Sequence, residues 1–124
     1  MSIQSSIVFL PCSDIQATHR FYTEVIGLAL HSTQSGGKAR IYDTGYGYWG
    51  FVQYGDRAIH SGAHGPTLSL NCESREDVNR LHAQVLSRGA QEISPPRIHE
   101  GFPVYSCFFS DPDGYKVELQ YITQ

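Results

Sequence analysis

The chain has 124 residues, 40% of them hydrophobic, which suffices for the core of one domain and excludes a second large one. Nine Lys and Arg against twelve Asp and Glu give a formal net charge of −3. The basic residues are scattered, so nucleic acid and anionic membranes are not expected partners. Three cysteines without CxxC spacing and no long apolar run indicate a cytoplasmic protein without a disulfide framework or membrane span.

The first half of the chain predicts one strand, one helix and then three strands. Residues 6–11 form a short apolar run that is typical of a buried strand. Ser13 and Gln16 have the spacing of a capping box, and apolar residues recur at helical spacing up to Gly27, which we expect to end the helix. Glycine-containing turns separate three strand-like segments, residues 28–34, 38–43 and 48–54.

The second half repeats this order after a polar linker at residues 56–66. Residues 67–72 predict a strand, Ser74 and Asp77 repeat the capping box, and Gly89 ends the second helix. Three further strands follow at residues 91–94, 104–110 and 115–121, with a proline-containing loop between the first two. We therefore expect two βαβββ repeats, one over residues 5–55 and the other over residues 67–123.

A direct alignment of the two halves supports the repeat. With an offset of 60 residues, Leu10 falls on Leu70 and Cys12 on Cys72; with an offset of 67, residues 47–48 fall on 114–115 and 53–54 on 120–121. One such unit is too small to bury both its helix and its sheet. We expect the two units to share a core, with the helix-free faces of both sheets enclosing a cup.

Two segments carry a resemblance to a known family. Residues 13–28, SDIQATHRFYTEVIGL, resemble the first-helix signature of the vicinal oxygen chelate (glyoxalase/bleomycin-resistance/dioxygenase) superfamily, and residues 108–121, FFSDPDGYKVELQY, resemble its last hairpin. With the repeat and the length, the resemblance covers essentially the whole chain. It implies a single α+β domain over residues 1–124, with a curved mixed sheet around a central cup, and a homodimer.

The resemblance also implies where a metal would bind. Family enzymes hold a divalent metal with ligands on the first and last strands of each half, which leaves open positions for two substrate oxygens. These positions correspond to Ile7, Phe51, Thr67 and Glu118. Only Glu118 is a good ligand, whereas catalytic transition-metal sites use about three protein ligands. We therefore expect no metal cofactor, and Glu118 is a relic, a hydrogen-bond acceptor, a general base or a solvent-facing residue.

The loop histidines offer an alternative metal site. His60 and His64 lie four residues apart in the linker, and His99 lies in the proline-rich loop, so these three with Glu118 are candidate ligands. A pair at this spacing makes a metal-binding face only on a helix, which the glycines and proline of the linker disfavour.

Strand alternation predicts which side chains face the cup. The expected aromatic and apolar wall with a few polar groups suits a planar or hydrophobic small molecule. Lys116 and Cys107 are also at strand positions expected to face the cup. In the strand at residues 38–43, either Arg40 and Tyr42 or their sequence neighbours face it. The predicted ligand-binding residues are Ile7, Phe9, Arg40, Tyr42, Trp49, Phe51, Gln53, Thr67, Ser69, Tyr105, Glu118 and Gln120.

Three functions follow from these observations. The first is a metal-free protein that sequesters or senses a small aromatic or hydrophobic molecule. The second is a metal-dependent enzyme similar to lactoylglutathione lyase or an extradiol dioxygenase, with Glu118 and the loop histidines as ligands. The third is a dimeric interaction module whose cup is filled by Trp49 and Phe51.

Overall fold

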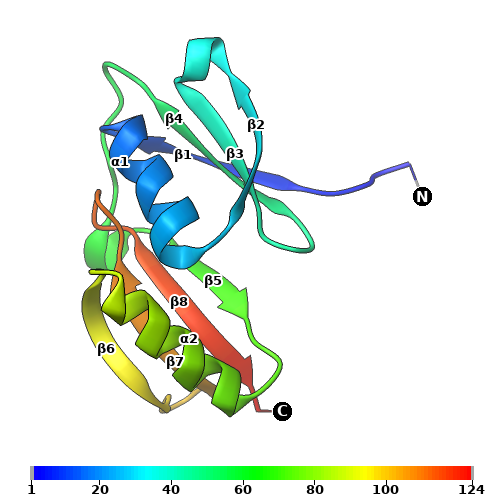
Figure 1. The fold of residues 1–124 in the computed structure, drawn as a ribbon, viewed down its shortest axis with the longest axis vertical. Coiled ribbons are helices and arrows are strands. Elements are labelled where there is room, and N and C mark those ends of the chain that lie inside the picture. The colour runs from blue at the N-terminus through cyan, green and yellow to red at the C-terminus, as the bar shows by residue number, and fades with distance from the viewer. Residues whose placement is uncertain (1, 124) are drawn as a thin grey trace. The chain divides into compact units, whose positions relative to one another are not determined.

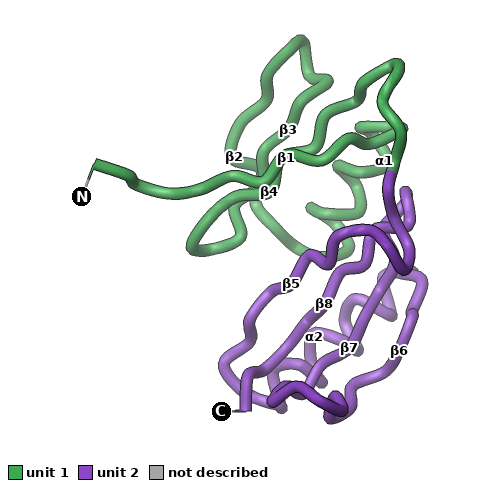
Figure 2. The backbone as a smooth tube through the Cα atoms, turned by 180° about the vertical axis from the view of Figure 1, so that it is seen from behind, with its two compact units in different colours: residues 1–59 green, residues 60–124 purple. Residues whose placement is uncertain are grey.

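The computed structural model describes residues 2–123, which form two compact units that divide between Ile59 and His60 (Figure 2). Each unit contains one four-stranded mixed sheet and one main helical segment, so the α+β class and the two βαβββ repeats are confirmed. No helix among these residues is long and apolar enough to cross a membrane.

The first unit has its strands in the order β1-β4-β3-β2, with β1 parallel to β4 and the other neighbours antiparallel. The predicted helix is present, but its N-cap is Asp14 and not Ser13, because the Asp14 carboxylate accepts from the free backbone N–H groups of Gln16 and Ala17. It ends at Gly27, whose φ of 97° is the left-handed stop that the sequence predicts. The elements are β1 (Ile7–Cys12), α1 (Ile15–Arg20), a π-helical continuation (Phe21–Ile26), β2 (Ala29–Gln34), a 3₁₀ turn (Ser35–Gly37), β3 (Ala39–Asp43) and β4 (Tyr48–Gln53).

The second unit repeats this topology in the order β5-β8-β7-β6. Half of the predicted capping box at its helix is observed, since the Ser74 hydroxyl accepts from the Asp77 backbone N–H at 3.1 Å, while the Asp77 carboxylate accepts from Arg80. The elements are a 3₁₀ turn (Gly62–His64), β5 (Thr67–Asn71), α2 (Arg75–Ser87), β6 (Gln91–Ile98), β7 (Val104–Ser110) and β8 (Lys116–Ile122).

Strand β6 is longer than the sequence predicts. Pro95 and Pro96, expected in a loop, lie inside it. The sheet tolerates them because β6 is an edge strand whose outer N–H groups need no partner, and its pairing with β7 shifts register around this point.

The helix of each unit packs on one face of its own sheet and buries an apolar layer there. In the first unit, the Tyr22 ring stacks on Phe51 with centroids 4.5 Å apart and meets Trp49 edge to face at 6.1 Å. In the second unit, α2 lies across the sheet (Figure 1), and its buried Val78 and Val85 accompany the buried strand residues Phe109, Val117 and Leu119. Strand side chains of the opposite parity therefore point away from the helix.

Substitution of Phe51 by alanine tests the helix-side packing. Phe51 is fully buried, so we expect Phe51→Ala to lower the free energy of unfolding by about 3–5 kcal/mol. The control is Phe102→Ala, which removes a ring that is 66% exposed and should cost less than about 1 kcal/mol. Urea unfolding followed by circular dichroism measures both, and equal losses would contradict the assigned orientations.

Candidate functional site

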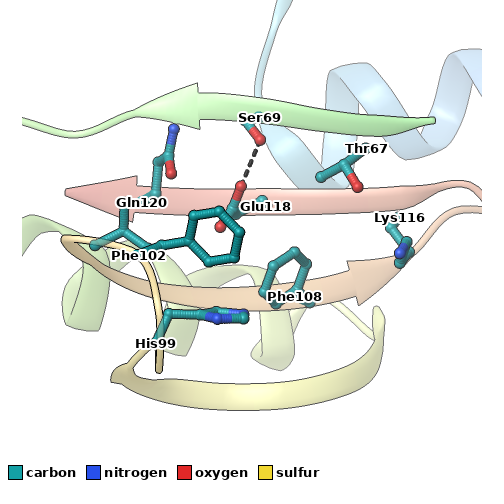
Figure 3. Close-up of a pocket in the computed structure, with 9 residues that line it drawn as sticks. Thr67, Ser69, His99, Phe102, Phe108, Lys116, Glu118 and Gln120 are labelled. Atoms are coloured by element: carbon teal, nitrogen blue, oxygen red, sulfur yellow. Dashed lines mark hydrogen bonds between the residues drawn. The ribbon is translucent and has the colours of Figure 1, made fainter. Parts of the chain in front are cut away.

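The second unit has a hollow on the face of its sheet that α2 leaves uncovered (Figure 3). It encloses about 390 Å³, within the usual range of small-molecule sites. Every lining residue belongs to this unit: Thr67, Ser69, His99, Phe102, Val104, Phe108, Lys116, Glu118 and Gln120.

Strand register places Glu118 at the centre of this hollow. Its strand β8 lies between β5 and β7, where Glu118 is paired with Ser69 on one side and Phe108 on the other. The Ser69 hydroxyl donates a hydrogen bond to Glu118 Oε1 at 2.5 Å. Glu118 is only 7% exposed, and it forms no ion pair with another residue in the described range 2–123. A carboxylate largely removed from water thus has one hydroxyl donor and no counter-charge.

Aromatic rings form the wall beside this carboxylate. The turn between β6 and β7 carries Phe102 and is closed by hydrogen bonds from the His99 N–H to the Val104 carbonyl at 3.0 Å and from the Phe102 N–H to the His99 carbonyl at 3.4 Å. The His99 ring meets Phe102 and Phe108 edge to face, with both centroid distances 5.8 Å (Figure 3). The hollow therefore combines π-faces with a buried acceptor.

Further polar groups lie along the same strand and wall. The Gln120 amide donates to Asn71 at 2.9 Å, and Lys116 lies at the other end of the row, beside Thr67 (Figure 3). The Nδ1 atom of His99 is buried and has no hydrogen-bond partner among residues 2–123. A buried polar atom without a partner costs free energy.

Four of the predicted ligand-binding residues come together in this hollow. They are Thr67, Ser69, Glu118 and Gln120. Their contact with a ligand stays a prediction, but their shared face follows directly from the parallel pairing of β5 with β8. Lys116, which has the same parity, also lines the hollow.

The predicted orientation is wrong for a set of first-unit residues, which face the helix instead. Trp49 and Phe51 contact Tyr22, and the Gln53 side-chain oxygen accepts from the Ile15 N–H at 2.9 Å at the start of α1. Arg40 pairs with Phe51 and Tyr42 pairs with Trp49 on the neighbouring strand, so both also lie on the helix side of the sheet. The affected residues are Arg40, Tyr42, Trp49, Phe51 and Gln53.

Tyr42 shows what this orientation does to a polar side chain. Its ring is fully buried, and its hydroxyl lies 3.0 Å from His19 Nδ1 on α1. Burial raises the pKa of Tyr42 to about 12, which the nearby Arg40 charge opposes. The same burial lowers the pKa of His19. This pair ties helix to sheet as neutral groups.

The predicted orientation is also wrong for Tyr105 and Cys107 of the second unit. The Tyr105 hydroxyl donates to Asn79 on α2 at 2.7 Å, so this residue faces the helix. Cys107 is fully buried on the same side, and burial raises the pKa of its thiol to about 12. Neither residue lines the hollow.

A one-residue shift between the repeats explains the errors in the first unit. Ser69 pairs with Glu118, and the equivalent Phe9 pairs with Gly50. The counterpart of Glu118 is therefore Gly50, not Phe51. A shift of one residue exchanges the two faces of a strand. The alignment of the two halves with an offset of 67 residues therefore placed the β4 side chains on the wrong face.

Gly50 is covered by an aromatic ring. A Cβ atom there would lie 2.5 Å from Phe9 Cδ1, so the Phe9 ring occupies the space that a side chain would need. Phe9 and Ile7 lie on β1 away from the α1 side and are each partly exposed. The first unit thus presents apolar groups where the second presents Ser69 and Glu118.

The residues at the family's four metal positions do not fit a metal ion. Ile7 and Gly50 have no donor side chain, Thr67 has only a hydroxyl, and Glu118 supplies the one carboxylate. Among residues 2–123, no three His, Cys, Asp or Glu side chains form a group that could hold a metal. The alternative site of His60, His64, His99 and Glu118 is therefore not assembled: His99 and Glu118 line the hollow, and the linker histidines do not.

Sequence reasoning missed the aromatic wall. Phe108 lies on the face of β7 opposite to that of Tyr105 and Cys107, which were predicted to face the cup. The hairpin turn at residues 111–114 could have indicated this, because it sets the register of β7 on β8. Phe102 lies in a turn, where no periodicity indicates which way a side chain points.

Comparisons with known proteins give one family. The model described as Glyoxalase/Bleomycin resistance protein/Dioxygenase superfamily matches residues 4–119. No curated protein matches the sequence.

Solved structures with the same fold cover nearly the whole chain. A glyoxalase/bleomycin resistance protein/dioxygenase family enzyme from Burkholderia phytofirmans PsJN is 20% identical, with a TM-score of 0.77 and coverage of 94% of this chain and 96% of that chain. A glyoxalase/bleomycin resistance protein/dioxygenase from Alicyclobacillus acidocaldarius is 14% identical, with a TM-score of 0.80 and coverage of 100% and 96%. A glyoxalase/bleomycin resistance protein from Albidiferax ferrireducens T118 is 22% identical, with a TM-score of 0.71 and coverage of 94% and 97%.

The hydrogen bond at the centre of the hollow can be tested by stability measurements. Ser69→Ala removes the one hydroxyl that donates to the buried Glu118 carboxylate among residues 2–123, and we expect it to lower the free energy of unfolding by about 1–3 kcal/mol at neutral pH. Thr67→Ala on the same strand and face is the matched control, because the Thr67 side chain is exposed like that of Ser69 but, in the described part of the chain, it is Ser69 that donates to Glu118. Denaturant unfolding of the two variants should separate them, and equal stabilities would argue against the bond.

Proposed function

The chain belongs to the glyoxalase/bleomycin resistance protein/dioxygenase superfamily, and we propose that within it this protein binds a small aromatic or hydrophobic molecule without a metal ion. The binding site is the hollow of the second unit. Sequestering or sensing the bound molecule is the role that such a site can serve.

One observation carries this proposal: an aromatic wall faces a polar floor in a hollow of ligand size. Phe102 and Phe108 supply flat apolar area, and Glu118 supplies an oriented acceptor. Small-molecule sites combine predominantly apolar walls with a few polar groups that set the orientation of the ligand. The size and lining of this hollow match that description.

The donor chemistry favours binding over the metal-dependent reactions of the family. A Lewis-acid mechanism needs about three protein ligands and open positions on the metal. The four family positions here supply one carboxylate, so a lyase, isomerase or dioxygenase of that kind lacks its ligand set. Glu118 is then available to the organic ligand itself.

The packing also disfavours an interaction module with a filled cup. Trp49 and Phe51 contact Tyr22 on the helix side of the first sheet, so they do not fill space on its opposite face. Pairing of two chains and a cytoplasmic location, both expected from the sequence and the family, belong to the proposal as well.

Binding to the hollow can be tested with a neutral aromatic probe. In an NMR titration with 2-naphthylmethanol, we expect shifts to gather at residues 67–69, 99–108 and 116–120. Phe102→Ala should weaken binding about tenfold, because it removes one aromatic wall. Tyr46→Ala, which removes a fully exposed ring of the first unit, should leave the affinity unchanged. Shifts confined to other residues would refute the assignment.

Native mass spectrometry of protein purified from its source tests the metal-free part separately. We expect a chain mass with or without an organic adduct and no stoichiometric transition metal, because the ligand set is too small to retain one. The same spectrum reports the number of subunits. About one tightly held transition-metal ion per chain would contradict the proposal.

A further inference from the structure

The carboxylate at the centre of the hollow lacks a counter-charge. Glu118 is 7% exposed, accepts one hydrogen bond through Oε1 from Ser69, and pairs with no cation among residues 2–123. A buried charge without a partner is costly, and proteins normally compensate it by an ion pair or several donors. Here the space beside the carboxylate is the hollow itself, so a bound molecule is placed to supply the missing charge.

The walls around Glu118 suit a positive charge as well. Phe102 and Phe108 present aromatic rings to the hollow, and the negative faces of such rings attract cations. Rings beside a carboxylate stabilise an organic cation in two ways, because the carboxylate binds its N–H groups and the rings contact its charged and apolar parts. A neutral molecule would gain the apolar contact and at most a hydrogen bond to Glu118, without the attraction between opposite charges.

The other titratable side chains that line the hollow do not cancel this preference. Lys116 pairs with Thr67 at one end of the hollow. It lies two residues before Glu118 on the same face of β8, a distance of about 6–7 Å along the strand. It forms no ion pair with Glu118 despite this proximity. His99 belongs to the aromatic wall and contacts Phe102 and Phe108.

We propose that the ligand of this hollow is an organic cation: a protonated amine or amidine on a planar or hydrophobic body. Its N–H groups donate to Glu118, chiefly to the oxygen that Ser69 leaves free, while its body lies against Phe102 and Phe108. Glu118 occupies a position that binds the metal ion in metal-dependent family members. Here the positive charge that it binds belongs to the organic ligand. This inference rests on the proposed function and narrows its ligand class.

The test compares three probes of one shape and different charge. Calorimetric titrations of the full chain at pH 7 use 2-naphthylmethylamine, 2-naphthylmethanol and 2-naphthoate, which are cationic, neutral and anionic. We expect the amine to bind about tenfold more tightly than the alcohol, and the carboxylate most weakly. Glu118→Gln keeps the shape and an acceptor for Ser69 but removes the negative charge, so it should weaken binding of the amine and bring its affinity to within about twofold of that of the alcohol.

Lys116→Met is the matched control at the second charged position. It should keep the amine preference or increase it, because it removes a repulsive charge from the same strand face. An alcohol or carboxylate that binds wild-type protein as tightly as the amine would overturn the cation assignment while leaving the proposed function intact. So would an amine preference that survives in Glu118→Gln. Failure of all three probes to bind would overturn the proposed function and this inference with it.

Discussion

The candidate site depends on one constraint, the alternation of side chains across a sheet that a helix covers on one face only. In the second unit, α2 buries Phe109 and Val117, so their strand neighbours Phe108 and Glu118 must point to the opposite face. Parallel pairing of β5 with β8 then brings Ser69 beside Glu118. The polar centre of the hollow is therefore set by the same packing that forms the core.

The hollow holds a combination that would be unfavourable inside a core. A carboxylate at 7% exposure with one hydroxyl donor is costly unless water or a ligand completes its interactions. It is tolerated here because it borders an open volume lined by aromatic rings. Polar groups whose interactions within the protein are incomplete are typical of functional sites.

The two units share a topology but present different chemistry at equivalent positions. Where the second unit pairs Ser69 with Glu118, the first pairs Phe9 with Gly50 and lays the Phe9 ring over the glycine. The strand order and the helix-side packing are thus repeated, while the helix-free face differs. This agrees with the general rule that core positions maintain a fold and that function depends on the residues grafted onto it.

The sequence by itself determined the element order, the repeat and the family, because glycine stops, capping residues and apolar periodicity act locally. It also placed Glu118, Ser69, Thr67 and Gln120 on one face of the second sheet, since alternation from a correctly placed strand end needs no long-range information. Only the tertiary structure decided which way β4 and β7 face and that Phe102 and Phe108 wall the hollow. The physical reason is that a strand has two faces one residue apart, and the choice between them is made by the register against distant strands and by the helix that packs there.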